Sequence, residues 1–153
     1  MIERVGQGIT RVVRQPVFGG QDRGVSPKGA MDLFSYATGN ILLGNNTNDP
    51  ALEIIVPPVI RFTEDAWFVV TGAGWGRLTV EGSNHAILRH AEVYRAWAGD
   101  TLSFGEKRYG FRSYLCYKAV VDEIKGNGPK GRRRGDFRTV ASWPDEKGYI
   151  RVV

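Results

Sequence analysis

The sequence contains few of the residues that build disulfide frameworks and metal centres. Its 153 residues include a single cysteine, Cys116, and two histidines, His85 and His90. One cysteine cannot form a disulfide within the chain, and its apolar neighbours predict a buried thiol. No cysteine or carboxylate is placed to complete a zinc site with the histidines. We therefore expect no metal, no internal disulfide and a reducing, cytoplasmic location.

Long hydrophobic runs are also missing. The longest apolar stretches, Leu52–Val56 and Trp67–Val70, are far shorter than the roughly 20 residues that a membrane-spanning helix needs. The first residues hold no apolar run typical of a secretory signal. Apolar residues make up 42% of the chain and charged residues 24%, which is a globular composition. We expect a folded protein without a membrane partner.

The basic character of the chain is concentrated in one segment. The net charge is +5, and residues 122–138 hold six basic residues against three acidic ones. Four glycines and a proline in this segment predict a polar loop or linker without a packed core. Phe137 is the one aromatic residue there, so the segment lacks the stacking groups of a nucleic-acid interface, and we do not expect nucleic acid as a partner.

Glycine is abundant, with 20 residues, and it separates many short segments rich in β-branched and aromatic residues. Such a pattern is typical of a mainly β fold, either a barrel or a sandwich. The predicted strands are Ile9–Arg14, Leu52–Val56, Val59–Thr63, Trp67–Thr71, Arg77–Val80, Ala86–Arg89, Glu92–Trp97, Thr101–Phe104 and Phe111–Ala119. Two further strands are predicted at Val140–Trp143 and Tyr149–Val153.

One helix is predicted over Leu33–Leu43. Its apolar residues fall on one side at helical spacing, and we expect Phe34 and Ile41 to dock this side against the fold. Asp32 stands at the N-cap position, and Gly44 supplies the C-terminal stop.

Several short motifs occur in a collinear order that resembles one protein family. They are Gln21-Asp22-Arg23-Gly24, Gly29-Ala30-Met31-Asp32, Gly44-Asn45, Ala51-Leu52-Glu53, Thr71-Gly72-Ala73, Ala98-Gly99-Asp100-Thr101-Leu102 and Arg112-Ser113-Tyr114-Leu115. Together they resemble the KipA family, whose members are also called the C-type subunit of 5-oxoprolinase or allophanate hydrolase subunit 2. The same unit occurs in the carboxyltransferase part of biotin-dependent urea carboxylase.

The chain departs from the family pattern in two places. Arg23-Gly24 runs straight into Val25, so the Gly-Arg-x-Gly part of the first motif is missing. After Tyr117 the chain enters the basic segment, whereas the family continues into a second large portion. The resemblance therefore implies the N-terminal half of a KipA protein or a shortened relative. We predict a KipA-like β-rich domain over 1–121, a linker over 122–138 and a C-terminal strand segment over 139–153.

The resemblance also implies a function, a fold and partners. Family members have a cyclophilin-like fold and handle small cyclic or planar amides such as 5-oxoproline, urea and allophanate. They act with a KipI-like partner, the B-type subunit of 5-oxoprolinase. The chain has no biotinyl-lysine motif, so ATP or biotin would enter only through partner subunits. As a partner, a second copy of the chain, giving a homo-oligomer, is the alternative to the KipI-like subunit. As a function, a non-catalytic regulatory or binding module of the same family is the alternative.

A substrate site is predicted in the loop before the helix, because an amide needs paired donors and acceptors and close backbone approach. The predicted substrate-binding residues are Gln21, Asp22, Gly24, Lys28, Asp32 and Glu53. No catalytic residue is evident. For three of these residues a structural alternative stays open: Asp22 in an Asx turn, Asp32 as a helix cap and Lys28 in solvent.

Glu53 lies within the predicted strand Leu52–Val56, between the apolar residues Leu52 and Ile54. Alternation along the strand leaves two placements open. The side chain points outward into solvent, or it faces the glycine-rich loop and pairs with Arg23 or Lys28.

Overall fold

The computed structural model describes residues 2–25, 27–82 and 85–119, and these fold into two antiparallel β-sheets with one α-helix. The predicted segments 122–138 and 139–153, with the two strands expected in the latter, lie outside the described residues. No helix among the described residues is long and apolar enough to cross a membrane.

The first sheet has the strand order β1-β4-β9-β6-β7, and the second has the order β2-β3-β10-β5-β8. The strands of the first are β1 (Ile2–Val5), β4 (Val59–Phe62), β9 (Thr101–Phe104), β6 (Leu78–Glu81) and β7 (Ala86–Leu88). Those of the second are β2 (Ile9–Val13), β3 (Ala51–Val56), β10 (Lys107–Ala119), β5 (Ala66–Trp75) and β8 (Tyr94–Ala96). In the described part of the chain, the pairings join strands within each sheet and do not close a barrel.

All nine strands predicted before residue 120 are confirmed, and β1 is an additional strand. The strand predicted to end at Thr71 continues to Trp75 in the structure. Gly72 and Gly74 do not end β5 but lie inside it, opposite the irregular part of β10 between Tyr109 and Ser113. A side chain at Gly74 would overlap the Tyr109 ring, since an added Cβ would lie 2.1 Å from it. These glycines therefore admit close packing of β10 on β5 and do not form a turn.

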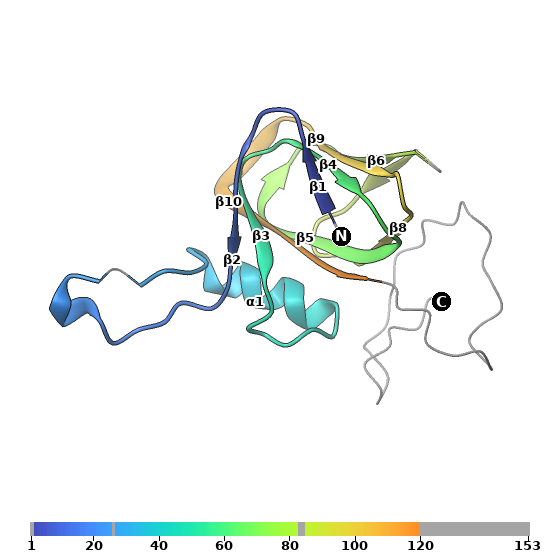
Figure 1. The fold of residues 1–153 in the computed structure, drawn as a ribbon. Helices are drawn as coiled ribbons and strands as arrows, with labels where there is room; N and C mark the ends of the chain where they lie inside the picture. Colours follow the sequence, from blue (N-terminus) through green and yellow to red (C-terminus); the bar gives the residue numbers. More distant parts are fainter. Residues whose placement is uncertain (1, 26, 83–84, 120–153) are drawn as a thin grey trace, which may run out of the picture.

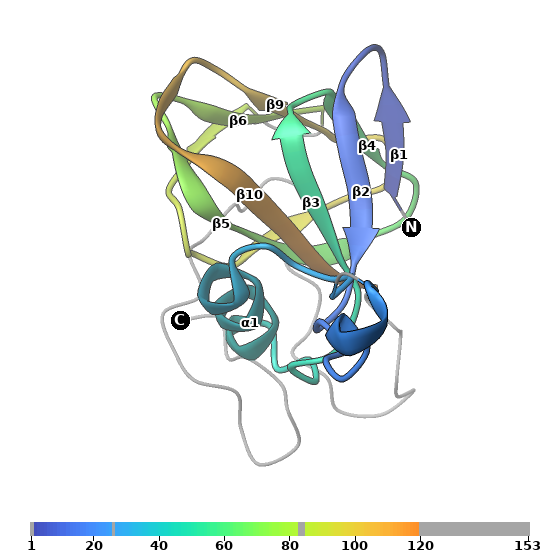
Figure 2. The ribbon, with the colours of Figure 1, turned by 90° about the vertical axis from the view of Figure 1, so that its left-hand side faces the viewer.

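Two hydrophobic layers explain why the central strands are apolar on both sides. Phe68, Val70 and Leu115 point into the core between the two sheets. Their neighbours Val69 and Cys116 point the other way, into a second core under the helix, as the period of two in a strand requires. Figure 2 shows α1 (Leu33–Leu42) beneath β5 and β10. The result is a three-layer arrangement of sheet, sheet and helix.

The helix is confirmed, but the face that docks it differs from the prediction. Phe34 is 82% exposed and Ile41 is 44% exposed, whereas Tyr36, Gly39 and Asn40 are buried. The tyrosine hydroxyl and the Asn40 amide both donate to the carbonyl of Asp49, at 2.7 and 3.0 Å. Hydrogen bonds thus permit these polar groups to be buried, a partnership that apolar periodicity does not reveal.

Gly39 sets how closely the helix approaches the sheet. A Cβ at this position would lie 2.7 Å from Cys116 Sγ and 3.2 Å from Thr71 Oγ1. Cys116 is buried as expected, and burial raises the pKa of its thiol to about 12. The thiol is therefore a packing group, because at neutral pH it does not form the reactive thiolate.

Candidate functional site

Residues 14–25 and 27–32 form an arm that leaves the end of β2, projects from the two-sheet body and returns at the start of α1 (Figure 1). Its tip carries the short 3₁₀ helix η1 (Gln21–Arg23). Its neck is closed by a hydrogen bond from Ala30 N to Arg14 O at 3.0 Å. Gly29 permits this closure, because its φ is 156° and a Cβ there would lie 2.6 Å from Pro16 Cα.

Glu53 of β3 anchors the returning stem of the arm. Its side chain is fully buried on the face of the sheet that the arm covers. Oε1 accepts hydrogen bonds from Met31 N at 3.1 Å and from the Tyr114 hydroxyl at 2.8 Å. Oε2 accepts one from Arg11 Nε at 2.5 Å. One carboxylate therefore joins β2, β3, β10 and the arm.

The network continues from Glu53 to two more backbone groups of the stem. The Tyr114 hydroxyl accepts a hydrogen bond from Asp32 N at 2.8 Å, and Arg11 Nη2 donates to Gly29 O at 3.2 Å. The stem is thus held at Gly29, Met31 and Asp32 by side chains from three strands. Such a satisfied buried network fixes a unique geometry.

The pKa of Glu53 reflects two opposed effects. Burial by itself raises the pKa of a carboxyl group, but the hydrogen bonds from Arg11, Met31 N and Tyr114 outweigh burial and hold the pKa of Glu53 below its usual value. Burial, and to a lesser degree the contact with Glu53, raises the pKa of Tyr114. At neutral pH the pair is therefore a carboxylate and a neutral phenol donor.

The structure decides between the two placements that the sequence left open for Glu53. Its side chain faces the arm, but its charge partners are not Arg23 or Lys28. Arg11 is its directly opposite residue in the β2–β3 register, and Arg112 Nε lies 3.9 Å from Oε2. Among the described residues the alternative pairing with Arg23 or Lys28 is not found, because the strand register places Arg11 directly opposite Glu53.

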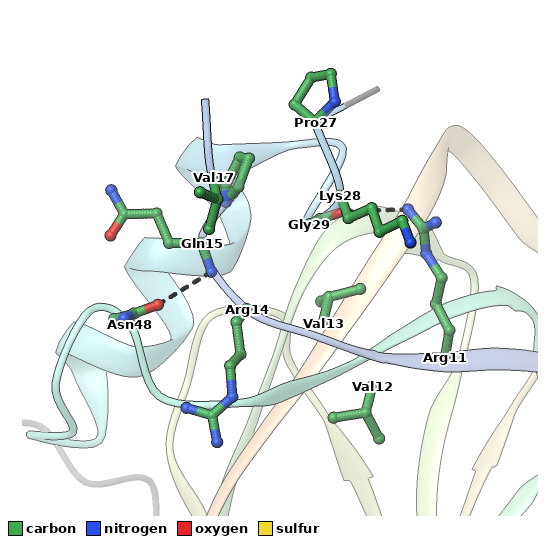
Figure 3. A pocket seen from close by; sticks show the side chains of 11 residues that line it. Arg11, Val12, Val13, Arg14, Gln15, Val17, Pro27, Lys28, Gly29 and Asn48 are labelled. Carbon is green, nitrogen blue, oxygen red and sulfur yellow. Dashed lines mark hydrogen bonds between the residues drawn. The ribbon is translucent and has the colours of Figure 1, made fainter. Parts of the chain in front are cut away.

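A hollow of about 780 Å³ opens between β2 and the neck of the arm (Figure 3). Cationic, amide and apolar groups line it, among them Arg11, Arg14, Lys28, Gln15, Asn48 and Val17. The side chains of Arg11 and Lys28 point toward each other, while Gln15 and Asn48 lie at the other end. There, Gln15 N donates to Asn48 Oδ1 at 3.3 Å.

Three of the predicted site residues lie away from this hollow, at the tip of the arm. Gln21, Asp22 and Gly24 are exposed there, and the Gln21 side chain accepts a hydrogen bond from Gly19 N at 3.1 Å. Asp22 lies 3.9 Å from the exposed Arg23. Gly24 ends η1 with a φ of 73°.

The other three predicted residues lie at the base of the arm. Lys28 lines the hollow, and Glu53 lies behind Arg11. Asp32 caps α1 by accepting from Ser35 N at 3.1 Å and from Ser35 Oγ at 2.6 Å, so the capping alternative holds.

Sequence reasoning missed Arg11, Gln15, Asn48 and Tyr114. Arg11 and Glu53 each interrupt a strand rich in β-branched residues. Opposite charges in two such strands are a signal for a cross-strand pair. No comparable signal marks Asn48, which follows the helix and reaches the arm only through the fold.

Large exposed hydrophobic side chains concentrate on the arm and beside it. Of the 14 large hydrophobics exposed in the described part of the chain, seven lie between residues 12 and 34: Val12, Val17, Phe18, Val25, Met31, Leu33 and Phe34. Phe18 is 62% exposed and Val17 81%. A cluster of this kind marks an interaction surface.

The two histidines do not contribute to this site. Among the described residues, no three groups of the metal-binding kinds lie together. His85 is exposed beside Glu81. His90 accepts a hydrogen bond from Trp75 N through Nε2 at 3.0 Å, and its Nδ1 is buried without a partner.

We expect His90 to make stability depend on pH. Burial lowers the pKa of His90 from its ordinary value, so the folded chain binds its proton less readily than the unfolded chain does. The stability that the neutral ring provides is complete above pH about 6.5 and falls as the pH drops toward the folded pKa. Urea unfolding between pH 5 and 8 should show this loss.

His90→Gln should flatten the pH dependence, because glutamine can accept from Trp75 N and does not titrate. His85→Gln, at an exposed histidine, serves as the control. An equal change in both variants would contradict the assignment to His90.

Comparison with known proteins decides the family. Residues 23–126 match the family model of the carboxyltransferase domain, subdomain A and B. The chain belongs to this carboxyltransferase family. Its KipA-like motifs fall on the arm, on the residues that follow α1, on strands β3, β5 and β10, and on the turn that leads into β9.

Relatives with established names include the C-type subunit of 5-oxoprolinase from Escherichia coli K12. The chain is 34% identical to it over 110 residues, which are 68% of this chain and 33% of that protein. Urea amidolyase of Saccharomyces cerevisiae is 34% identical over 103 residues, which are 67% of this chain and 5% of that protein. The chain thus spans about a third of the length of the 5-oxoprolinase relatives that it matches.

The fold has counterparts among solved structures. The crystal structure of Kluyveromyces lactis urea carboxylase superposes with a TM-score of 0.68 at 33% identity, over 76% of this chain and 10% of that one. The urea amidolyase of the same organism superposes with a TM-score of 0.65 at 33% identity, over 76% of this chain and 7% of that one. The resemblance that the motifs predicted is therefore confirmed in sequence and in fold.

Proposed function

We propose that this chain is one component of a 5-oxoprolinase or urea-amidolyase type complex acting on small cyclic or planar amides, with a KipI-like subunit as its partner. ATP or biotin enters the complex through the other subunits. The observation that carries the proposal is the exposed hydrophobic cluster on the projecting arm. One relative is named as a subunit, and the match covers only 5% of the other, urea amidolyase, which agrees with a part that works beside others.

The arm is built to be covered by another chain. No residue of η1 is buried, so the tip has no core of its own. The stem, by contrast, is fixed at Gly29, Met31 and Asp32. An apolar surface on an arm whose stem is already held in place loses less conformational freedom on binding, which favours association. The partner therefore needs an apolar surface facing Val17 and Phe18.

A second copy of the chain is the less favourable occupant. The net charge of +5 makes two copies repel each other, whereas a partner carrying carboxylates around an apolar patch is attracted. The cations of the arm, Arg14, Arg23 and Lys28, are exposed for such contacts. Gln21, Asp22, Gly24 and Lys28 remain the predicted substrate contacts, facing a site that the partner completes.

We expect the double variant Val17→Ser/Phe18→Ser to bind a purified KipI-like subunit at least about tenfold more weakly, because buried aromatic anchors dominate interface energies. Sedimentation velocity with the full chain measures the affinity. Ile87→Ser is the matched control, since Ile87 is 63% exposed but lies on β7, in the other sheet. If the chain sediments as a monomer and does not bind the KipI-like subunit, the proposed partner is wrong.

Activity separates the two functional alternatives. Omitting the chain from a reconstituted complex should abolish ATP-dependent ring opening of 5-oxoproline. If the KipI-like subunit binds the chain but omitting the chain leaves turnover unchanged, the non-catalytic regulatory module is the correct alternative. Self-association that Val17→Ser/Phe18→Ser removes would instead identify the arm as a contact between two copies.

A further inference from the structure

Arg11 and Lys28 bring two positive charges together at the base of the arm with donors to spare. Their side chains point toward each other across one end of the hollow (Figure 3). Arg11 uses Nε for Glu53 and Nη2 for Gly29 O. Its Nη1 and the Lys28 ammonium donate to no other residue in the described part of the chain. Both groups are thus ready to donate to a ligand.

The charges around this pair leave an excess of positive charge. Glu53 is the carboxylate that neutralises Arg11, and Arg112 lies 3.9 Å from the same carboxylate oxygen. One negative charge therefore faces two arginines, and Lys28 adds a third cation on the other side. Cations in such proximity disfavour one another unless an anion lies between them.

The geometry of Arg11 is fixed before any ligand arrives. Glu53 is fully buried and Gly29 lies in the closed neck of the arm, so the guanidinium is held from two sides. A donor that is already oriented loses little conformational entropy when a ligand binds. Lys28 brings a flexible ammonium to the same place.

From this arrangement we propose that the hollow at the arm base binds the carboxylate of a small molecule between Arg11 Nη1 and Lys28 Nζ. The proposal deepens the proposed function, on which it rests, by naming the ligand class of the hollow. The carboxylate receives one charge-assisted hydrogen bond from each cation. The body of the molecule lies against Pro16, Val17 and Pro27, toward the amides of Gln15 and Asn48.

A carboxylate suits this place better than a phosphate group does. Phosphate sites commonly use several free backbone N–H groups, and three consecutive ones of the returning stem are already engaged. Ala30 N donates to Arg14 O, Met31 N to Glu53 and Asp32 N to Tyr114. At this end of the hollow the side-chain donors of Arg11 and Lys28 lie together, and they match the two oxygens of a carboxylate.

The test is a titration of the full chain followed by NMR at the Arg11 Nε–H resonance and the Gly29 amide. The probes are 5-oxoproline, acetate, the uncharged lactam 2-pyrrolidinone and inorganic phosphate. We expect both carboxylates to shift these resonances saturably, with phosphate weaker than either, and 2-pyrrolidinone to leave them unchanged. Absence of a saturable shift with both carboxylates would overturn the proposal, and tighter binding of phosphate would overturn the ligand class.

Lys28→Gln should weaken carboxylate binding about tenfold, the loss of one charge-assisted hydrogen bond, and Lys28→Arg should retain most of the affinity. Arg23→Gln removes the same charge from the tip of the arm and should change the affinity less than about twofold. Equal losses in Lys28→Gln and Arg23→Gln would show a diffuse charge effect and refute a defined site. A chain that fails this test yet still binds the KipI-like subunit refutes the carboxylate site alone.

Discussion

Replacing Glu53 with alanine is expected to lower the free energy of unfolding by about 2–4 kcal/mol, because its buried carboxylate accepts three hydrogen bonds, while its partner Arg11 is half exposed. The substitution removes the acceptor of Arg11 Nε, Met31 N and the Tyr114 hydroxyl at once. The arm stem then loses two of its three anchors, because Arg11 is no longer oriented toward Gly29 O. Urea unfolding at pH 7 measures the loss.

Comparison variants separate the network from a mere change of charge. Glu81→Ala removes an exposed glutamate that contacts His85 and should change stability by less than about 0.5 kcal/mol. Glu53→Gln keeps the shape and one acceptor oxygen, so its loss should fall between the two. Similar stability of Glu53→Ala and the parent chain would show that the network does not hold the arm.

The same variant carries a pH signature. The folded pKa of Glu53 is lower than its ordinary value, so its stabilisation is complete above the unfolded pKa of about 4.3 and is lost as the pH falls through the folded pKa. The difference in stability between the parent chain and Glu53→Ala should therefore shrink in acid.

Gly72→Ala is expected to destabilise the fold by roughly 3 kcal/mol or more, the sum of backbone strain and overpacking. Gly72 has a φ of 90°, and an added Cβ would lie 2.4 Å from the backbone oxygen of Arg112. The backbone cannot move aside without separating β5 from β10, which carries Arg112 and Tyr114 to Glu53. Thermal and urea unfolding should both report the loss.

Gly99 offers a matched control for this clash. Its φ is 93°, nearly that of Gly72, but nothing lies within 4 Å of an added Cβ. Gly99→Ala therefore introduces strain without overlap and should cost only about 1 kcal/mol. An equal loss in both variants would mean that φ alone, and not the contact with β10, determines the need for glycine.

The positions of the strands could be predicted from the sequence, whereas the face by which the helix docks could not. Short β-branched segments separated by glycines are a local signal, and this signal located strands β3 to β10 along the chain. Phe34 and Ile41 have the correct periodicity but are exposed, because Gly39 and Asn40 fit the surface of β5 and β10 more closely. Close approach and hydrogen bonding to Asp49 O are properties of the assembled layers.

The sequence by itself determined the fold class, the helix Leu33–Leu42, the buried cysteine and the family, since each depends on local composition or on motifs in order. Only the tertiary structure decided that Glu53 pairs with Arg11, that Lys28 faces Arg11, and that Gln21 and Asp22 lie apart at the tip of the arm. Register and loop path bring together residues distant in the chain. Contacts of this kind leave no periodic trace in a single sequence.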